Sequence, residues 1–427
     1  MLSWRRFSLA TATKSKVEFL LWTCARGINV SRLVFTETLC TADVSRSVKK
    51  STNMRTVVLN GLDIKDTRGI LAALAFHCKD IRVLEVMTCT LDRSLRDVLD
   101  RNKELRELSL LSCDSSPSVD FSGLRCPKIE LINLTRTYLG IESVEALMSA
   151  GQNITKLTVF FGKNEIWTPP ASILLPRLRS LSMHNLSVEP AALYQLVHIM
   201  PSVTNLALNS LHMSDLVLSA VFRYCACIRT LSLHSQYEQD ANLPTDLSLR
   251  VLASYHALSL QVLSIRGCRL LTTTGVMTLV QNCPNLHTLS VPEDDSSQFM
   301  LTSAFVECIS KHPRLKTLHL CGSYLSEISI QSLTLHGHTL QVLGLNCMCE
   351  HEAVTRVLES CESLRTLYLS CTTLFDEDTG HNIGELNLKQ LRAAHPHVRI
   401  VTGMNVLKMF EFNPLVYPTY IGEVLRT

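Results

Sequence analysis

The sequence has little of what most classes of function require. Only 19% of its 427 residues are charged, the formal net charge is +3, and no cluster of Lys and Arg occurs. Such a balance argues against nucleic acid or an anionic membrane as a partner. No apolar stretch approaches the roughly 18 residues that cross a bilayer, and residues 1–22 lack the apolar core of a secretory signal.

Recognised catalytic patterns are also missing. The chain has no Walker A loop, G-x-S-x-G elbow, dinucleotide-binding fingerprint or H-E-x-x-H pair. His336, His338, Cys347, Cys349 and His351 are residue types that bind zinc, but a predicted strand separates them and the C-x-C spacing is unusual for such a site. We therefore predict that the protein is not an enzyme and holds no cofactor or metal.

What the sequence does contain is a repeated pattern, L-x-x-L-x-L. Its clearest copies begin at Leu105, Val203, Ile228, Leu260, Leu315, Leu340 and Leu364, and looser copies begin at Val30, Met54, Ile81, Ile129, Ile154, Leu178, Leu286 and Val398. Most starts are 24 to 27 residues apart, which is the period of a leucine-rich repeat. Because one unit cannot bury its apolar face alone, the pattern predicts an α/β solenoid of about 14–15 stacked repeats over residues 30–401.

Each repeat is expected to contain a short strand and a returning helix. Apolar residues alternate in the leucine segment, and amphipathic runs follow at 68–76, 143–150, 191–200, 275–282 and 353–360. Proline should end the helices, as at 126–127, 283–284 and 312–313. Parallel strands would line a concave face and helices a convex one. Residues 1–29 and 402–427 are predicted to cap the ends, although the C-terminal tail could instead fold over the concave face.

The 16 cysteines follow the repeat in their positions. Cys78, Cys126, Cys225, Cys283 and Cys361 each precede a repeat start by three residues. Cys89, Cys113 and Cys268 each lie three residues after the last apolar residue of the repeated pattern. This phase predicts small buried hydrophobic residues and free thiols. Such thiols suit a reducing compartment, so we expect a cytoplasmic or nuclear protein.

The unit from Leu260, LQVLSIRGCRLLTTTGVMTLVQNCPNL, resembles the cysteine-containing repeat of F-box/leucine-rich-repeat proteins. Those proteins are substrate receptors of cullin-type ubiquitin ligases, and the resemblance in repeat type covers about residues 28–400. It implies a protein partner on the concave face and contact with a Skp1 adaptor ahead of the repeats. Only 29 residues precede the first predicted strand, too few for a complete F-box, but Trp4, Arg5, Arg6 and Phe7 look like the end of one.

The amino-terminal segment also allows another interpretation. Residues 1–16 contain four basic residues and no acidic one, a composition typical of a mitochondrial transit peptide. A structural or assembly factor of a mitochondrial or cytoskeletal complex is therefore the alternative to a substrate-recognition subunit.

The concave face supplies a candidate binding row. The residues two positions beyond the centre of five successive strands are Phe160, His184, Asn209, His234 and Arg266. Neighbouring strands lie about 4.8 Å apart, so these side chains would form a row of hydrogen-bonding groups with an aromatic ring at one end. Such a row could hold an extended peptide, and the alternative is a solvated polar face.

Two repeats are longer than the others, and their additional residues are expected to form a rim of loops beside this row. Additional residues follow two strands, in 235–246 and 292–298, and both segments are acidic. Insertions of this kind fall in loops on one side of a solenoid. We therefore include Glu293, Asp294 and Asp295 among the partner-binding candidates, which would suit a partner with basic groups. The segment 160–170 is expected to expose aromatic side chains on the same rim.

Overall fold

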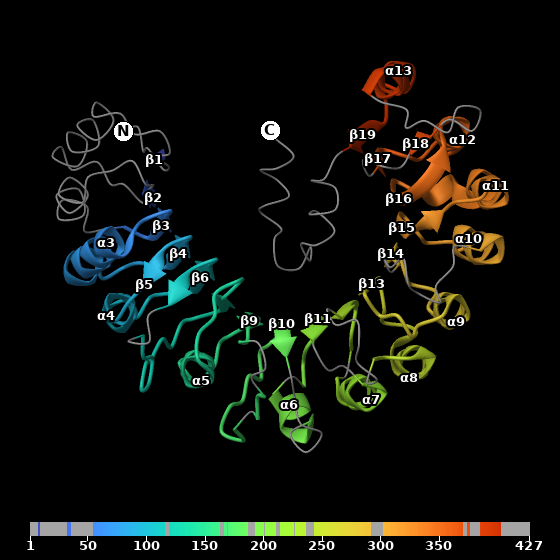
Figure 1. Ribbon diagram of the computed structural model, residues 1–427. Coiled ribbons are helices and arrows are strands. Elements are labelled where there is room, and N and C mark those ends of the chain that lie inside the picture. The colour runs from blue at the N-terminus through green and yellow to red at the C-terminus, as the bar shows by residue number, and fades with distance from the viewer. Residues whose placement is uncertain are drawn as a thin grey trace, which may run out of the picture. The chain divides into compact units, whose positions relative to one another are not determined.

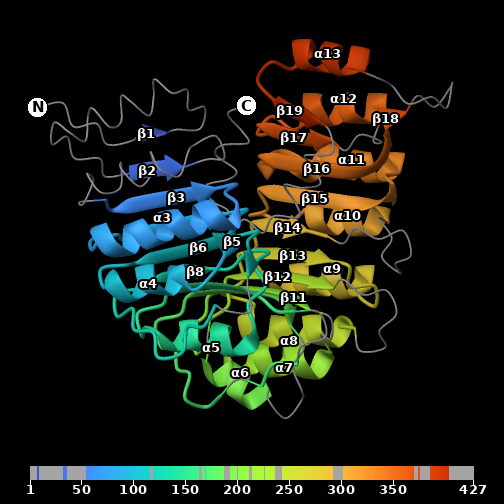
Figure 2. The ribbon, with the colours of Figure 1, turned by 60° about the vertical axis from the view of Figure 1, so that its left-hand side comes forward.

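The computed structural model describes residues 7–8, 32–35, 54–115, 119–162, 166–168, 170–186, 193–199, 201–210, 214–225, 227–235, 243–291, 302–369, 374–375 and 385–402. The chain divides into two compact units, unit 1 from Met1 to Ser202 and unit 2 from Val203 to Thr427. Within each unit, parallel strands stack side by side and helices cover the other side of the sheet (Figures 1 and 2).

In unit 1 the long sheet has the order β1-β2-β3-β4-β6-β8-β9-β10, and every neighbouring pair is parallel. The strands are β1 (Phe7–Ser8), β2 (Arg32–Phe35), β3 (Thr56–Asn60), β4 (Val83–Met87), β5 (Thr90–Leu91), β6 (Glu107–Leu111), β7 (Asp114–Ser115), β8 (Leu131–Asn133), β9 (Lys156–Phe160) and β10 (Ser180–Leu186). The helices are α3 (Ile64–His77), α4 (Ser94–Arg101), α5 (Ile141–Ser149) and α6 (Leu193–Ile199).

In unit 2 the order is β11-β12-β13-β14-β15-β16-β17-β19, again parallel throughout. The strands are β11 (Asn205–Ser210), β12 (Thr230–Ser235), β13 (Val262–Arg266), β14 (Thr288–Ser290), β15 (Thr317–Tyr324), β16 (Val342–Glu350), β17 (Thr366–Leu369), β18 (Leu374–Phe375) and β19 (Arg399–Thr402). The helices are α7 (Asp215–Tyr224), α8 (Asp246–His256), α9 (Thr273–Asn282), α10 (Ser303–Ser310), α11 (Glu327–His336), α12 (His351–Ser360) and α13 (Glu385–Ala394).

The predicted phase of the repeat is confirmed. A strand begins two residues after every predicted start, except for β19, which begins one residue after Val398. Because a strand is pleated, buried and outward-facing side chains alternate along it. In β13, Leu263 and Ile265 are buried and their neighbours face outward. The leucine-rich-repeat solenoid, with parallel strands on one face and helices on the other, is therefore the observed fold.

The helices begin where the sequence supplies a cap. In unit 2, Ser214, Thr245, Thr272, Thr302 and Ser326 each accept a hydrogen bond from a backbone N–H two or three residues later. The Asp246 carboxylate also accepts bonds from the backbone N–H and hydroxyl of Thr272, at 2.8 and 2.6 Å. Asp246 therefore links α8 to the start of α9. The sequence pattern places its segment, 235–246, on an acidic rim, so this residue is a correction to that prediction.

Two repeats of unit 1 depart from the expected strand-and-helix unit. The described residues between β7 and β8 and between β9 and β10 form turns without a helix. The expectation that proline at 126–127 ends a helix is therefore wrong. These segments contain Pro117, Gly123, Pro169 and Pro170, which disfavour helix.

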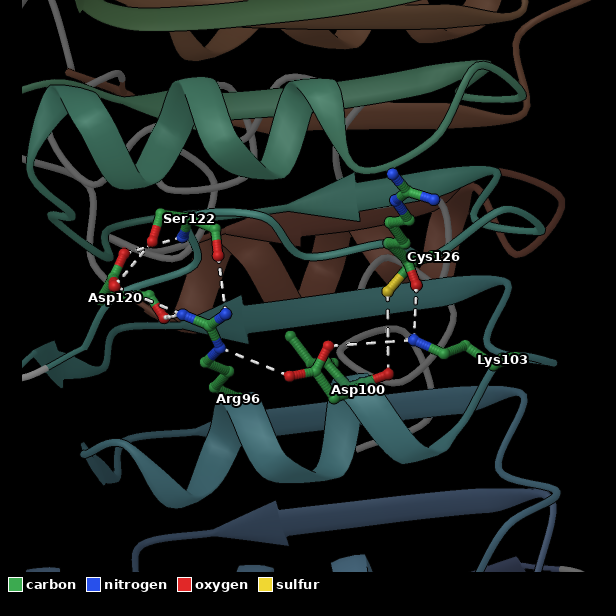
Figure 3. Close-up of polar contacts among 8 residues, drawn as sticks. Arg96, Asp100, Lys103, Asp120, Ser122 and Cys126 are labelled. Carbon is green, nitrogen blue, oxygen red and sulfur yellow. Dashed lines mark hydrogen bonds and ion pairs between the residues drawn. The ribbon is translucent and has the colours of Figure 1, made fainter.

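Side chains from α4 hold the first of these turns in place. Figure 3 shows Arg96 of α4 reaching across to Asp120 and Ser122. Lys103, two residues after α4, donates to the Arg125 carbonyl at 3.0 Å. The Arg96 guanidinium donates to the backbone carbonyl of Ser122 at 2.6 Å and lies 3.3 Å from the Asp120 carboxylate. Phe121 is fully buried beneath the turn. Because these contacts replace a helix, this part of the convex side is closed by a turn that a neighbouring helix supports.

The second turn segment corrects the expectation of an aromatic rim at 160–170. Phe161 and Trp167 are fully buried, and their ring centroids lie 5.2 Å apart. The Trp167 indole N–H donates to Glu145 Oε1 at 3.0 Å, which ties the segment to α5. Of the three aromatic residues in this segment, only Phe160, at the end of β9, is partly exposed.

Candidate functional site on the strand faces

The predicted row is divided between the two units, and each part is described by itself. In unit 1, Phe160 ends β9 and pairs in register with His184 of β10. Their rings stack, with centroids 4.0 Å apart and planes 9° from parallel. Tyr138, which is half exposed, approaches Phe160 edge-on at 6.3 Å. We call Tyr138, Phe160 and His184 the aromatic cluster.

A hydrogen bond orients the imidazole of this cluster. The Ser182 hydroxyl lies 2.9 Å from His184 Nε2, two residues earlier on the same face of β10. The following residue, Asn185, has a positive φ of 56° and its amide donates to the Phe161 carbonyl at 3.2 Å. These bonds hold the end of β10 against the end of β9, where the ring of His184 stacks on Phe160.

In unit 2 the row comprises Asn209, His234 and Arg266, which we call the polar row. Asn209 pairs in register with His234, and His234 pairs with Arg266, on β11, β12 and β13. The sequence prediction of adjacency is thus confirmed within this unit. The side chains are partly exposed, and their order along the row is amide, imidazole and guanidinium.

The pKa of His234 in the polar row lies below that of a free histidine. Burial, together with the charge of Arg266, lowers the pKa of His234 to about 4. At neutral pH the imidazole is therefore uncharged and can both donate and accept a hydrogen bond. Asn209 Oδ1 is buried and has no hydrogen-bond partner among the described residues. The row offers an unsatisfied acceptor, a neutral ring and a permanently charged guanidinium.

Unit 2 has a second pair of neighbouring rings, which belong to residues that were not among the candidates predicted from the sequence. His319, Gly344 and Tyr368 occupy equivalent positions on β15, β16 and β17. Gly344, on the strand between them, has no side chain, and the ring centroids of His319 and Tyr368 lie 6.3 Å apart. Burial lowers the pKa of His319 to about 4. A glycine between two rings in one column was the signal that could have found this pair. Tyr138 gave no comparable signal, because it lies beyond the strand.

The remaining predicted site residues cannot be placed. Glu293, Asp294 and Asp295, as well as Trp4, Arg5 and Arg6, lie outside the described residues. The backbone of Phe7 pairs in parallel with that of Leu33, so β1 adds to the sheet beside β2. The acidic rim and the adaptor contact therefore stay predictions.

The cysteines show no reactive or metal-binding arrangement in the described part of the chain. All eight cysteines predicted from the phase are buried and free. Burial raises the pKa of Cys78 and Cys268 to about 12, which disfavours the nucleophilic thiolate. Within the described ranges, no group of three or more His, Cys, Asp and Glu side chains could hold a metal ion. No helix in these ranges is long and apolar enough to span a membrane.

Comparisons with known proteins show the fold. No family model matches the chain. The antagonist of mitotic exit network protein 1 from Eremothecium gossypii is 33% identical over 95 residues, 22% of this chain and 24% of that protein. The chain thus spans about a quarter of the length of this relative.

Solved structures match over much more of the chain. A chain of the yeast Rad7–Elc1 complex has a TM-score of 0.52 at 16% identity and covers 93% of this chain and 91% of that one. A chain of the TLR13–ssRNA13 complex has a TM-score of 0.52 at 12% identity, with 81% and 46% covered. At such identities the likeness concerns architecture alone.

Proposed function

We propose that this protein is a non-enzymatic binding scaffold whose strand faces hold segments of a protein partner. The aromatic cluster of unit 1 and the polar row of unit 2 are the proposed contacts. Their strand residues alternate with buried ones, and Figure 1 shows the helices of each unit on one side of its sheet. Parallel strands already satisfy their backbone groups within the sheet, so a partner would be recognised by outward-facing side chains.

The polar row carries the proposal. Asn209 Oδ1 is a buried acceptor without a partner in the described part of the chain, and such groups are uncommon in folded proteins. A donor from a bound segment would satisfy it, and the neutral imidazole of His234 lies beside it in register. The partly exposed aromatic cluster adds the kind of side chain that dominates the energy of protein interfaces.

The finer proposal is a substrate-recognition subunit of a cullin-type ubiquitin ligase. It is supported by the resemblance of the repeat from Leu260 to F-box/leucine-rich-repeat proteins. It also fits the likeness to a chain of the yeast Rad7–Elc1 complex, in which a protein of this architecture is part of a protein complex. Trp4, Arg5, Arg6 and Phe7 are the proposed contact with Skp1.

The scaffold proposal is tested by quantitative affinity purification from cells. We expect His184→Ala, and separately the double variant His234→Ala with Arg266→Ala, to lose the partners that wild type recovers. Arg250→Ala, an exposed arginine on α8, is the matched control. Each partner is then purified and titrated against wild type and variants. Unchanged affinity in all of the strand-face variants would contradict the proposal.

The ligase proposal has its own experiment. Wild type is co-expressed with Skp1 and a cullin and isolated by size-exclusion chromatography. Co-elution that the quadruple alanine variant of Trp4, Arg5, Arg6 and Phe7 abolishes is the expected result. If neither protein co-elutes with wild type, the ligase role fails while the binding scaffold stands.

A further inference from the structure

One column of side chains in unit 2 lies at the start of the strands, before the alternating segment. From the repeat of β12 onward, each repeat of unit 2 contributes the residue after its first apolar position. In chain order these are Arg229, Gln261, His287, Lys316, Gln341, Arg365 and Arg399, which we call the basic edge. The backbone N–H of each donates to the carbonyl of the preceding one, with distances from 2.7 to 2.9 Å from Gln261 onward. The hydrogen-bonded ladder therefore places the seven side chains in one line.

The cations of this line are available to a partner. Arg229, Lys316 and Arg365 are exposed, and their side chains make no hydrogen bond or ion pair with any described residue. Gln261, Gln341 and His287 stand between them and add hydrogen-bonding groups. Burial, and then the charge of Lys316, lowers the pKa of His287, which favours its neutral form.

In unit 2, the two columns of outward-facing residues next to the basic edge contain no acidic residue on the described strands β12 to β17. The next outward residues are Thr230, Val262, Thr288, Thr317, Val342 and Thr366, and the column after them is Ser232, Ser264, Ser290, His319, Gly344 and Tyr368. Unit 1 differs, because there Arg106 pairs with Glu130 at 3.3 Å and Glu85 and Glu107 lie on the strands. The nearest acid in sequence to Arg365 is Glu362, which forms no ion pair with any described residue.

We infer that the basic edge of unit 2 binds an acidic, extended segment of a protein partner laid across the strand starts. The inference rests on the proposed scaffold function only in that both require a protein partner, and it uses different residues from the polar row. It also reverses the partner charge expected from residues 293–295, since the described strand face of unit 2 attracts carboxylates.

The spacing of the cations fits such a segment. At about 4.8 Å per strand, the step from Arg229 to Lys316 is roughly 14 Å and the step from Lys316 to Arg365 is roughly 10 Å. An extended peptide advances about 3.3 Å per residue, so roughly eight residues with acids on one face would span these three cations. Arginine and carboxylate also pair through two parallel hydrogen bonds. The seven residues of the edge include no Phe, Tyr or Trp on which a nucleic acid base could stack.

The test uses a labelled 12-residue peptide of alternating Glu and Ser, with a Gln-Ser peptide as the uncharged probe. Binding to the full chain is followed by fluorescence anisotropy at low and moderate salt. We expect the Glu peptide to bind and the Gln peptide not to. The triple variant Arg229→Gln, Lys316→Gln, Arg365→Gln should weaken binding about tenfold, since three exposed charge pairs are lost.

A matched variant removes three exposed cations elsewhere, by Arg101→Gln, Arg250→Gln and Lys389→Gln. It has the same net charge and should bind within about twofold of wild type, which separates the edge from general attraction. Circular dichroism confirms that both variants fold. Equal loss in both variants, or equal binding of the Glu and Gln peptides, would overturn the inference. So would a single-stranded oligonucleotide that displaces the peptide and itself depends on Arg229, Lys316 and Arg365. Retained peptide binding in the polar-row variant separates this result from the proposed function.

Discussion

At the scale of single residues, six of the described strands have one residue with an unusual backbone conformation at or near their end. Gly61, Thr88, Ser112, Arg136, Asn185 and Gly267 have positive φ values, between 49° and 66°. Asn185 directly follows His184 of the aromatic cluster, and Gly267 directly follows Arg266 of the polar row. Non-glycine residues adopt this conformation at a cost of roughly 1–2 kcal/mol.

Gly267, which follows Arg266 of the polar row, tolerates a side chain least. A Cβ at this position would lie 2.1 Å from the Ser235 carbonyl oxygen, which belongs to the neighbouring strand backbone. We expect Gly267→Ala to lower the free energy of unfolding by about 3 kcal/mol in urea denaturation. Gly123→Ala is the control, because Gly123 has a similar φ of 70° but no atom within 4 Å. Equal losses in the two variants would show that the close approach contributes nothing.

The buried histidines predict how stability depends on pH. Burial lowers the pKa of His234 and His319 to about 4 and also lowers that of His256 and His312. In the unfolded chain a histidine takes up a proton near pH 6.5, whereas these folded histidines resist it. Their contribution to stability is therefore complete above pH 6.5 and is lost as the pH falls from 6.5 toward 4.

This dependence is measured as the urea midpoint at pH 7.5 and at pH 5.0. Wild type should lose stability at the lower pH, and His319→Gln should lose less of it than wild type does. His397→Gln, at an exposed position, should leave the difference unchanged. A midpoint that does not move between the two pH values would refute the assignment.

At the scale of elements, the repeat places thiols at the junctions between helix and strand. Cys78, Cys225, Cys283 and Cys361 follow helices α3, α7, α9 and α12, and all are buried. The sulfur of Cys361 lies 3.8 Å from the Leu333 carbonyl of α11, so this side chain packs against the preceding repeat. Cysteines at the same position of different repeats are therefore buried alike.

Alkylation of the native protein tests this pattern. Brief treatment with iodoacetamide followed by mass spectrometry should modify the half-buried Cys227 and Cys308 before the buried cysteines, because burial raises the pKa of the buried thiols and shields them. In urea all of these positions should react at similar rates. Rapid modification of Cys283 or Cys268 in the native state would argue against the packing described.

At the scale of the whole molecule, stability should be distributed along each unit. Every repeat contacts chiefly its neighbours, so a local defect is expected to weaken adjacent repeats more than distant ones. Leu263 of β13 is fully buried, and Leu263→Ala should cost about 2–5 kcal/mol.

Hydrogen exchange measures how far that defect spreads. In Leu263→Ala, protection should fall most in β12, β13 and β14 and least in β3 and β4 of unit 1. The control is Leu258→Ala, which truncates an exposed leucine near the end of α8. Uniform loss of protection through both units would mean that the chain unfolds as one cooperative body.

Much of the fold was predictable because it depends on a local period. Apolar residues at L-x-x-L-x-L positions must alternate in a strand, and the same phase placed Cys126 and Cys268 in the core. The row in unit 2 was predictable for the same reason, since Asn209, His234 and Arg266 hold equivalent positions in parallel strands. The helix-less turns were only partly predictable, because proline and glycine disfavour a helix there, whereas the burial of Trp167 depends on its contact with Glu145 of the preceding repeat.

The sequence by itself determined that this chain stacks, which side chains leave the core, and that no known catalytic pattern is present. Periodicity suffices for these, because each repeat meets almost the same surroundings as the next. Tertiary structure alone decided which outward side chains lack a partner, that the pKa of His234 falls to about 4, and that Arg229, Lys316 and Arg365 form a line without an acid beside them. Those properties depend on burial and on distances between repeats, and only the packed molecule defines them.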